Sequence, residues 1–185
     1  MPTLAEPITD VDLWADCRAG SSEALAELYD RFASPLLAYL LSLTADRDAA
    51  EEVLQQVFVE VLRLGPALPQ DRRPSAYLFA SARNRAANLV RESQARQRAL
   101  FAYELLARQK ASGCFAGDET LEQELLARLN SGLRWLSEGE REAILLHTQG
   151  ELTFQEIARI TGEPQGTVAT RYRTGLEKLR GYLSL

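Results

Sequence analysis

Apolar residues recur at helical spacing along almost the whole chain, and no segment shows the sustained alternation of apolar and polar positions that marks a strand. The pattern weakens only between about residues 94 and 124, where turn-forming residues and acids become frequent. We therefore expect an all-α fold of two small helical domains joined by a partly helical linker. The expected ranges are 1–95 for the first domain, 96–127 for the linker and 128–185 for the second domain.

The N-terminal domain is expected to hold four helices, because polar capping residues or prolines precede each apolar stripe. Pro35 lies inside the second stripe, so we expect a kink or a split in that helix. Gly65 and Pro66 end the third stripe. The four helices are expected over residues 10–18, from Ser21 or Ser22, from Asp46 to about Leu62, and from Pro74 or Ser75 to Arg91 or beyond.

Two capping boxes open successive helices of the C-terminal domain, at Ser137–Glu140 and Thr153–Glu156. The second helix breaks at Gly162, and Pro164 suits the first turn of the helix that follows. A short helix, a tight glycine turn and a longer helix form the pattern of a helix-turn-helix, whose second helix enters the DNA major groove. The exposed positions of that helix are expected to be Gln165, Thr167, Thr170, Arg171 and Arg173. The same pattern is compatible with an ordinary helix pair that has a solvated basic face.

The formal net charge of −5 argues against a uniformly basic nucleic-acid-binding protein, but the charge is unevenly distributed. Acids dominate the first thirty residues, whereas arginines dominate residues 72–98. Cys17 and Cys114 lack the spacing of a metal site and indicate a reducing compartment. The N-terminus lacks the pattern of a signal peptide, and the most apolar stretch is too short to span a membrane. We therefore expect a cytoplasmic protein with no membrane insertion.

Four stretches resemble the bacterial sigma factors of the extracytoplasmic-function (ECF) group. "EIARITGEPQGTVATR" and the preceding "LSEGEREAILLHTQGELTFQEIA" resemble the second domain of that family. "ADRDAAEEVLQQVF" resembles its polymerase-binding segment, and "AYLFASARNRAANLVRE" resembles its helix for the promoter element nearer the start site. The resemblance covers roughly residues 23–183 in the family's order.

The resemblance implies a transcription initiation factor without a catalytic site, a cofactor or a metal. Such a protein binds core RNA polymerase, recognises the −10 (near) and −35 (far) promoter elements, and starts transcription of a specific regulon. An anti-sigma factor commonly holds it inactive. By position, the polymerase-binding residues would be Glu51, Glu52, Gln55, Gln56 and Phe58. The near-element residues would be Arg72, Arg73, Arg83, Asn84, Arg85, Asn88 and Arg91, with a flipped base caught in the loop 66–73, and Gln165, Thr167, Thr170, Arg171 and Arg173 would read the far element.

Some positions depart from the family pattern. Gln56 stands where an acid is common, Asn88 replaces a frequent Asp, and Ala169 replaces a common Lys that would contact a phosphate. The acidic stretch from Asp118 to Glu124 fits either a mimic of RNA in a polymerase channel or a helix start that favours acids. These departures affect promoter choice and binding strength more than the class of protein.

Three other functions are compatible with parts of the sequence. An enzyme would have to use His147, the only histidine, which sits beside an apolar run typical of a structural position. A stand-alone helix-turn-helix regulator explains the tail but not the polymerase-like segment. A sigma mimic that acts only by protein–protein binding is compatible with the Gln56 departure.

Overall fold

The computed structural model describes residues 8–104, 132–133 and 135–183. All regular structure within these ranges is helical, which confirms the predicted fold class. The elements are α1 (Asp10–Arg18), α2 (Ser22–Thr44), α3 (Arg47–Leu64), the 3₁₀ turn η1 (Gly65–Ala67), α4 (Pro74–Glu104), α6 (Glu138–Thr148), α7 (Phe154–Thr161) and α8 (Gln165–Leu183).

Side-chain caps open the helices where the sequence predicted them. Ser21 and Asp46 accept hydrogen bonds from the backbone N–H groups three residues later. Ser137 and Thr153 form the two predicted capping boxes, and Thr9 forms a third at the start of α1. Each such cap typically stabilises a helix by about 1 kcal/mol, because it satisfies a donor that has no partner within the helix.

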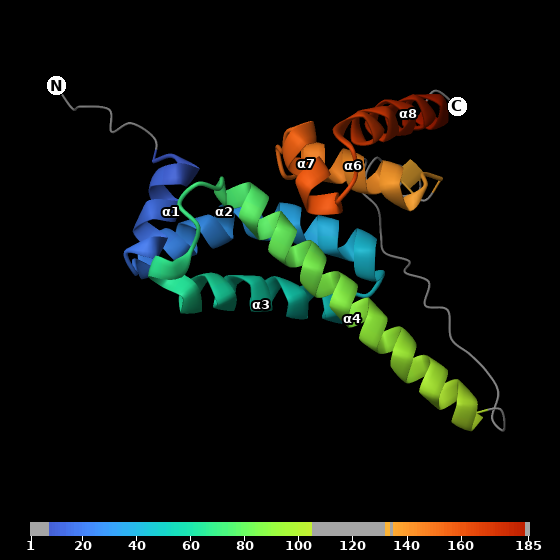
Figure 1. Cartoon of the computed structure of the whole chain (residues 1–185), viewed down its shortest axis with the longest axis horizontal. Coiled ribbons are helices and arrows are strands. Elements are labelled where there is room, and N and C mark those ends of the chain that lie inside the picture. The colour runs from blue at the N-terminus through green and yellow to red at the C-terminus, as the bar shows by residue number, and fades with distance from the viewer. Residues whose placement is uncertain (1–7, 105–131, 134, 184–185) are drawn as a thin grey trace, which may run out of the picture.

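The helices α2 and α4 are the longest in the described ranges. The helix α2 runs from Ser22 to Thr44 with Pro35 inside it, so the proline does not split the helix. It ends at Ala45, whose φ of 52° lies in the left-handed region. The helix α4 continues to Glu104, into the range expected for the linker, and projects beyond the rest of the bundle (Figure 1).

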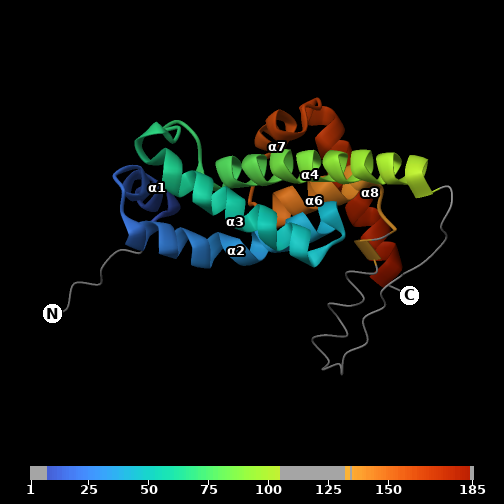
Figure 2. The same ribbon diagram turned by 90° about the horizontal axis from the view of Figure 1, so that it is seen from below.

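Helices α1 to α4 form the N-terminal lobe. In Figures 1 and 2, α2, α3 and α4 lie side by side, and α1 packs at the end of the bundle where α2 begins. The centre of this lobe is filled by fully buried side chains from three helices, among them Leu36, Val57 and Phe79. Trp14 of α1 is also buried, at 3% exposure, with its ring 5.2 Å from that of Tyr77 on α4.

Helices α6 to α8 form the C-terminal lobe, which packs on the N-terminal lobe through α2 and α4. The two lobes share one continuous cluster of buried side chains, to which the C-terminal lobe contributes Leu146, Leu152, Ile157 and Val168 among others. Figure 1 shows α3 on the side of the bundle away from α6, α7 and α8. Trp135, just before α6, is 75% exposed. Because the two lobes share one buried cluster, the described parts of the chain are in a closed arrangement.

The structure bears on three features noted in the sequence: the cysteines, the acidic stretch and the apolar stretches. Cys17 is a buried free thiol, and burial together with the charge of Asp16 raises its pKa. Cys114 and the acidic stretch from Asp118 to Glu124 lie outside the described residues. None of the helices in the described ranges has the length and apolar character needed to cross a bilayer.

Candidate nucleic-acid interface

The outer face of α3 carries most of the residues predicted to bind polymerase. Glu52 and Gln55 are exposed, whereas Glu51 and Gln56 are half-buried. Because residues three and four apart share a helix face, these side chains form one strip, which we name the α3 ridge (Glu51, Glu52, Gln55 and Gln56). Gln56 Nε2 donates to Glu52 Oε1 at 2.9 Å, and Glu51 Oε1 accepts from Arg47 Nε at 2.7 Å. Among the residues that the structure describes, no hydrogen bond joins the ridge to the C-terminal lobe.

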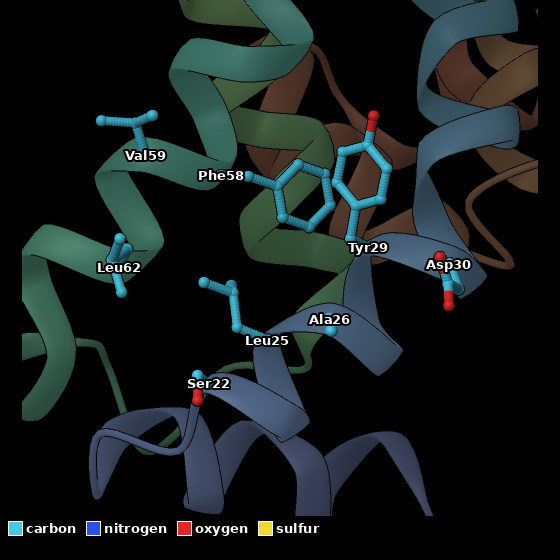
Figure 3. A pocket seen from close by; sticks show the side chains of 8 residues that line it. All are labelled: Ser22, Leu25, Ala26, Tyr29, Asp30, Phe58, Val59 and Leu62. Carbon is cyan, nitrogen blue, oxygen red and sulfur yellow. The ribbon is translucent and has the colours of Figure 1, made fainter.

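Phe58, the fifth predicted polymerase-binding residue, is buried and faces an apolar groove between α2 and α3 (Figure 3). Its ring packs edge-on against Tyr29, with ring centroids 4.9 Å apart. Val59 and Leu62 line the same groove and are 61% and 64% exposed. Val59 also borders a polar hollow that holds most of the α3 ridge, so the groove and the ridge form one continuous surface.

Arg83 of α4 points to the C-terminal lobe, although the sequence placed it on a DNA-facing helix. Its Nε donates to Glu142 Oε1 of α6 at 2.8 Å, and the Tyr39 hydroxyl donates to the same oxygen at 2.8 Å. Burial opposes the charge on Arg83, but the hydrogen bond and charge of Glu142 outweigh it, so the pKa of the guanidinium is raised. Burial and the nearby Glu142 carboxylate raise the pKa of Tyr39 far above its ordinary value.

Arg85 points in another direction, to α3. Its Nη2 donates to Glu60 Oε2 at 2.9 Å and its Nη1 donates to Gln56 Oε1 at 3.3 Å. Burial raises the pKa of Glu60, but the hydrogen bonds from Arg85 and Ser81 outweigh it, so the net shift is downward. The remaining predicted residues of α4, Asn84, Asn88 and Arg91, are exposed.

The loop from Pro66 to Arg73, predicted to hold a flipped base, is anchored by α1. Trp14 Nε1 donates to the Pro69 carbonyl at 2.8 Å, and Arg18 Nε donates to the Leu68 carbonyl at 2.9 Å. Neither side chain was predicted from the sequence to have a role. A visible signal was that Arg18 is the only basic residue among the acids of residues 1–30.

The two predicted basic residues at the end of this loop differ in their contacts. Arg72 is exposed. Arg73 Nη1 donates to the Glu151 carbonyl at 3.2 Å and lies 3.5 Å from Glu156 Oε2, and both acceptors belong to the C-terminal lobe. Within the described ranges, Arg73 and Arg83 are therefore the predicted near-element residues that form ion pairs with the C-terminal lobe.

Helices α7 and α8 form the predicted helix-turn-helix. Gly162 ends α7 with a φ of 75°, a left-handed conformation that glycine adopts at little cost. Gln165, Thr167, Thr170 and Arg173 are exposed on α8. Arg171 is only half-exposed, because its guanidinium pairs with Glu163 Oε2 at 2.6 Å and lies over Gly139 of α6.

His147 packs inside the C-terminal lobe. Its ring stacks on Phe154 with centroids 4.8 Å apart and meets Tyr172 edge-on at 4.6 Å. Its Nδ1 lies 2.8 Å from the Leu152 carbonyl. These contacts place the only histidine of the chain in a structural position that joins the three C-terminal helices.

Two family models match the chain, one on each lobe. "Sigma-70 region 2" matches residues 28–96, and "Sigma-70, region 4" matches residues 125–179. The chain is 30% identical over 162 residues to the ECF RNA polymerase sigma factor RpoE of Cereibacter sphaeroides, with 87% of each chain covered. It is 28% identical to the RNA polymerase sigma factor CarQ of Myxococcus xanthus, over 90% of this chain and 92% of that protein.

Two solved structures have a similar fold. CnrH in complex with the cytosolic domain of CnrY superimposes with a TM-score of 0.64 at 23% identity, over 95% of this chain and 97% of CnrH. The sigma factor RpoE of Bartonella quintana, in complex with the anti-sigma factor NepR, gives the same TM-score at 22% identity, over 89% of this chain and 99% of RpoE. At these identities the similarity concerns the arrangement of helices.

Proposed function

Because this chain belongs to the ECF group of RNA polymerase sigma factors, we propose that the α3 ridge docks on core polymerase and that arginines of α4 and α8 contact promoter DNA. The protein is an alternative sigma factor, which binds core RNA polymerase, recognises the two promoter elements and starts transcription of a specific regulon. Sigma factors are not enzymes in the catalytic sense. We infer further that this chain has no catalytic activity of its own and acts in the cytoplasm, where the polymerase is.

The observation that carries the assignment of the polymerase surface is the α3 ridge. It lies within the match to sigma-70 region 2, and it presents carboxylates and amides from one side of α3. The apolar groove beside it exposes Val59 and Leu62, which are large apolar side chains. Large apolar side chains next to charged ones are typical of a protein–protein interface, where the apolar part supplies binding energy and the charges supply orientation.

The DNA-binding surfaces are proposed from exposed basic and amide side chains. Four predicted residues are exposed around the start and middle of α4: Arg72, Asn84, Asn88 and Arg91. The two arginines among them are cations that can hold the backbone of an opened strand. On α8, Gln165 and Arg173 are exposed in the first half of the second helix of the helix-turn-helix. Side chains of these types can read base edges or hold phosphates in the major groove.

We also propose that an anti-sigma factor regulates the protein. The similar structure of RpoE from Bartonella quintana is a complex with such a factor, NepR. The apolar groove between α2 and α3 lies next to the α3 ridge, so a protein seated there would compete with polymerase. A competition experiment between a candidate inhibitor and core polymerase would test this point.

Run-off transcription tests the function directly. Core polymerase reconstituted with the purified chain should start transcripts from promoters mapped in cells, and core polymerase alone should not. Chain that neither co-elutes with core polymerase nor supports any transcript would overturn the proposed assignments. Co-elution without transcription would instead favour a mimic that acts by protein–protein binding.

A further inference from the structure

Arg85 lies on a different face of α4 from the exposed residues proposed to contact DNA. Ser81 and Arg85 are one helical turn apart, and both donate to Glu60 Oε2 of α3. Asn84 and Asn88 are exposed on another side of the helix, because successive helix residues point about 100° apart. The side chain of Arg85 is therefore directed to α3 and the polymerase-binding surface.

Glu60 fixes the plane of the Arg85 guanidinium. Arg85 Nε and Nη2 donate to Glu60 Oε2 at 3.3 Å and 2.9 Å, and Ser81 Oγ donates to the same oxygen at 2.9 Å. A guanidinium is planar and its donors form a rigid fork. The two hydrogen bonds to Glu60 therefore determine where the remaining nitrogen, Nη1, points.

Gln56 connects this nitrogen to the outer side of α3. Arg85 Nη1 donates to Gln56 Oε1 at 3.3 Å, and Gln56 Nε2 donates to Glu52 Oε1 at 2.9 Å. An amide can accept with its oxygen and donate with its nitrogen, whereas a carboxylate at this position could accept from Arg85 but could not donate to Glu52. Four side chains thus form a chain of hydrogen bonds from α4 to the α3 ridge, which we name the Arg85 relay (Arg85, Glu60, Gln56 and Glu52).

The relay ends at the surface. Glu52 is exposed, whereas the side chains of Arg85 and Glu60 are only 31% and 24% exposed. All four members line the polar hollow that Val59 joins to the apolar groove. A protein that docks on the α3 ridge would meet the Glu52 carboxylate directly, while the inner members of the relay support it from behind.

A held carboxylate has two advantages over a free one in such an interface. A free glutamate side chain samples several rotamers, and the loss of this freedom on binding reduces affinity. The hydrogen bond from Gln56 removes part of that freedom before a partner arrives. The Arg85 cation is also neutralised by Glu60, so it adds no free positive charge to the acidic ridge.

We propose that Arg85 is a positioning residue of the polymerase-binding surface and not a DNA-binding residue. Through Glu60 and Gln56 it holds Glu52 in the orientation in which the α3 ridge meets core polymerase. This inference rests on the proposed function of the ridge. It also reassigns a residue that the family resemblance had placed at the near promoter element.

The test uses the full-length chain and purified core polymerase. Arg85→Met removes the donors and keeps most of the aliphatic length, and Arg159→Met makes the same change of net charge at an exposed position of α7. By biolayer interferometry, Arg85→Met should bind core polymerase about fivefold more weakly than Arg159→Met, a size expected for the ordering of one long side chain. Holoenzyme assembled with saturating Arg85→Met should bind mapped promoter DNA with the wild-type salt slope, whereas loss of a phosphate contact would lower that slope by about one.

A double-mutant cycle with Glu52 separates positioning from a general loss of structure. Glu52→Ala should weaken polymerase binding about tenfold, because it removes a charge of the ridge. In this background Arg85→Met should have no further effect, since the end of the relay is missing, whereas a loss of packing would weaken binding in both backgrounds. If Arg85→Met loses helical circular dichroism, Glu60→Gln, which loosens the guanidinium, should give a smaller loss of affinity with the same dependence on Glu52.

The inference is wrong if Arg85→Met binds core polymerase as tightly as Arg159→Met while Glu52→Ala binds more weakly. It is equally wrong if the effect of Arg85→Met is the same with and without Glu52, or if Arg85→Met lowers the salt slope of promoter binding. Failure of the proposed function would look different. In that case Glu52→Ala itself would bind core polymerase like the wild-type chain, and the relay would have no role in docking.

Discussion

The α3 ridge and the arginines of α4 belong to the same lobe but differ in what they contact. The ridge carries carboxylates and amides whose hydrogen bonds stay within the N-terminal lobe, and its outer side is exposed. On α4, Arg83 is bound by Glu142 of the other lobe, and Arg73 just before α4 is bound by Glu151 and Glu156. One surface is thus open to a partner while the other is partly occupied by the chain itself.

This difference determines what a partner would have to displace on each surface. A partner that docks on the ridge finds it in place, whereas a nucleic acid that needs Arg83 must first displace Glu142. Displacement has a cost, because it removes a buried carboxylate from its two donors and exposes apolar surface between the lobes. Polymerase binding can offset that cost if the polymerase holds the separated lobes at two distinct sites.

Removing a buried apolar side chain from the cluster that the two lobes share should have the largest effect on stability. Leu146→Ala deletes a fully buried side chain of α6 and should lower the free energy of unfolding by about 2–5 kcal/mol. Because the two lobes share one buried cluster, urea unfolding followed by circular dichroism should show a single shifted transition. A separate early transition of the C-terminal lobe alone would show that the lobes fold independently. The exposed Glu138→Ala change on the same helix serves as the control.

Reversing the charge of the α3 ridge should have the next largest effect, on polymerase affinity. Glu51→Lys with Glu52→Lys should weaken binding to core polymerase by roughly a hundredfold, about 2.7 kcal/mol, because like charges replace complementary ones. The double change Glu138→Lys with Glu177→Lys alters net charge equally at exposed positions of the C-terminal lobe. Biolayer interferometry should show weaker polymerase binding for the ridge double variant than for this control double variant. Equal affinities would remove the ridge from the interface.

Two arginines in the first half of α8, Arg171 and Arg173, should differ from each other by a smaller effect. Arg173 is exposed and Arg171 is paired with Glu163, so Arg173→Ala removes a cation that is available to a phosphate. We expect Arg173→Ala to weaken far-element binding about fivefold to tenfold and to reduce the salt slope by about one. Arg171→Ala should lower transcription while leaving polymerase binding intact. Titrations of holoenzyme on promoter DNA at several salt concentrations measure these effects, and identical salt slopes for wild type and Arg173→Ala would contradict the assignment.

The smallest expected effect concerns the pair between α3 and α4. Hydrogen bonds from Arg85 and Ser81 lower the pKa of Glu60 below its ordinary value of 4.5, against the opposing effect of burial. A carboxyl whose pKa is lower in the folded state stabilises the fold above its unfolded pKa and loses that contribution as the pH falls through the folded pKa. Glu60→Gln should therefore cost less than about 1 kcal/mol at neutral pH and flatten the acid limb of the stability curve. Thermal melts from pH 7 to pH 3 measure the stability of both proteins as a function of pH. An acid limb that is the same in Glu60→Gln and wild type would show that other groups cause the acid sensitivity.

The helix starts were predictable because their causes are local. Ser137, Thr153 and Asp46 each cap a helix through atoms only a few residues away, so a short window of sequence contains the whole interaction. A kink or a split was expected at Pro35, and the split is absent for the opposite reason. Proline removes one backbone hydrogen bond, but the buried residues on both sides, among them Phe32 and Leu36, hold α2 together through contacts with other helices.

The candidate site was predictable only in part. Helical periodicity placed Gln165, Thr167, Thr170 and Arg173 on an exposed face, where the structure has them. Periodicity does not show that Arg171 is held by Glu163, because that pair joins α8 to the turn before it. The position of the C-terminal lobe on Arg83 depends on contacts between residues far apart in the sequence, and no local pattern describes such contacts.

The two tryptophans give the protein a built-in optical reporter. Trp14 is buried in the N-terminal lobe at 3% exposure, and Trp135 stands at the entrance of α6 at 75% exposure. An indole shielded from solvent emits at shorter wavelengths than one in water, so the emission spectrum contains one contribution from each lobe. Iodide, which quenches only accessible indoles, should quench the fluorescence of Trp135 and leave that of Trp14 unchanged. Single changes to phenylalanine would then assign each spectral component and allow each lobe to be followed without an attached dye.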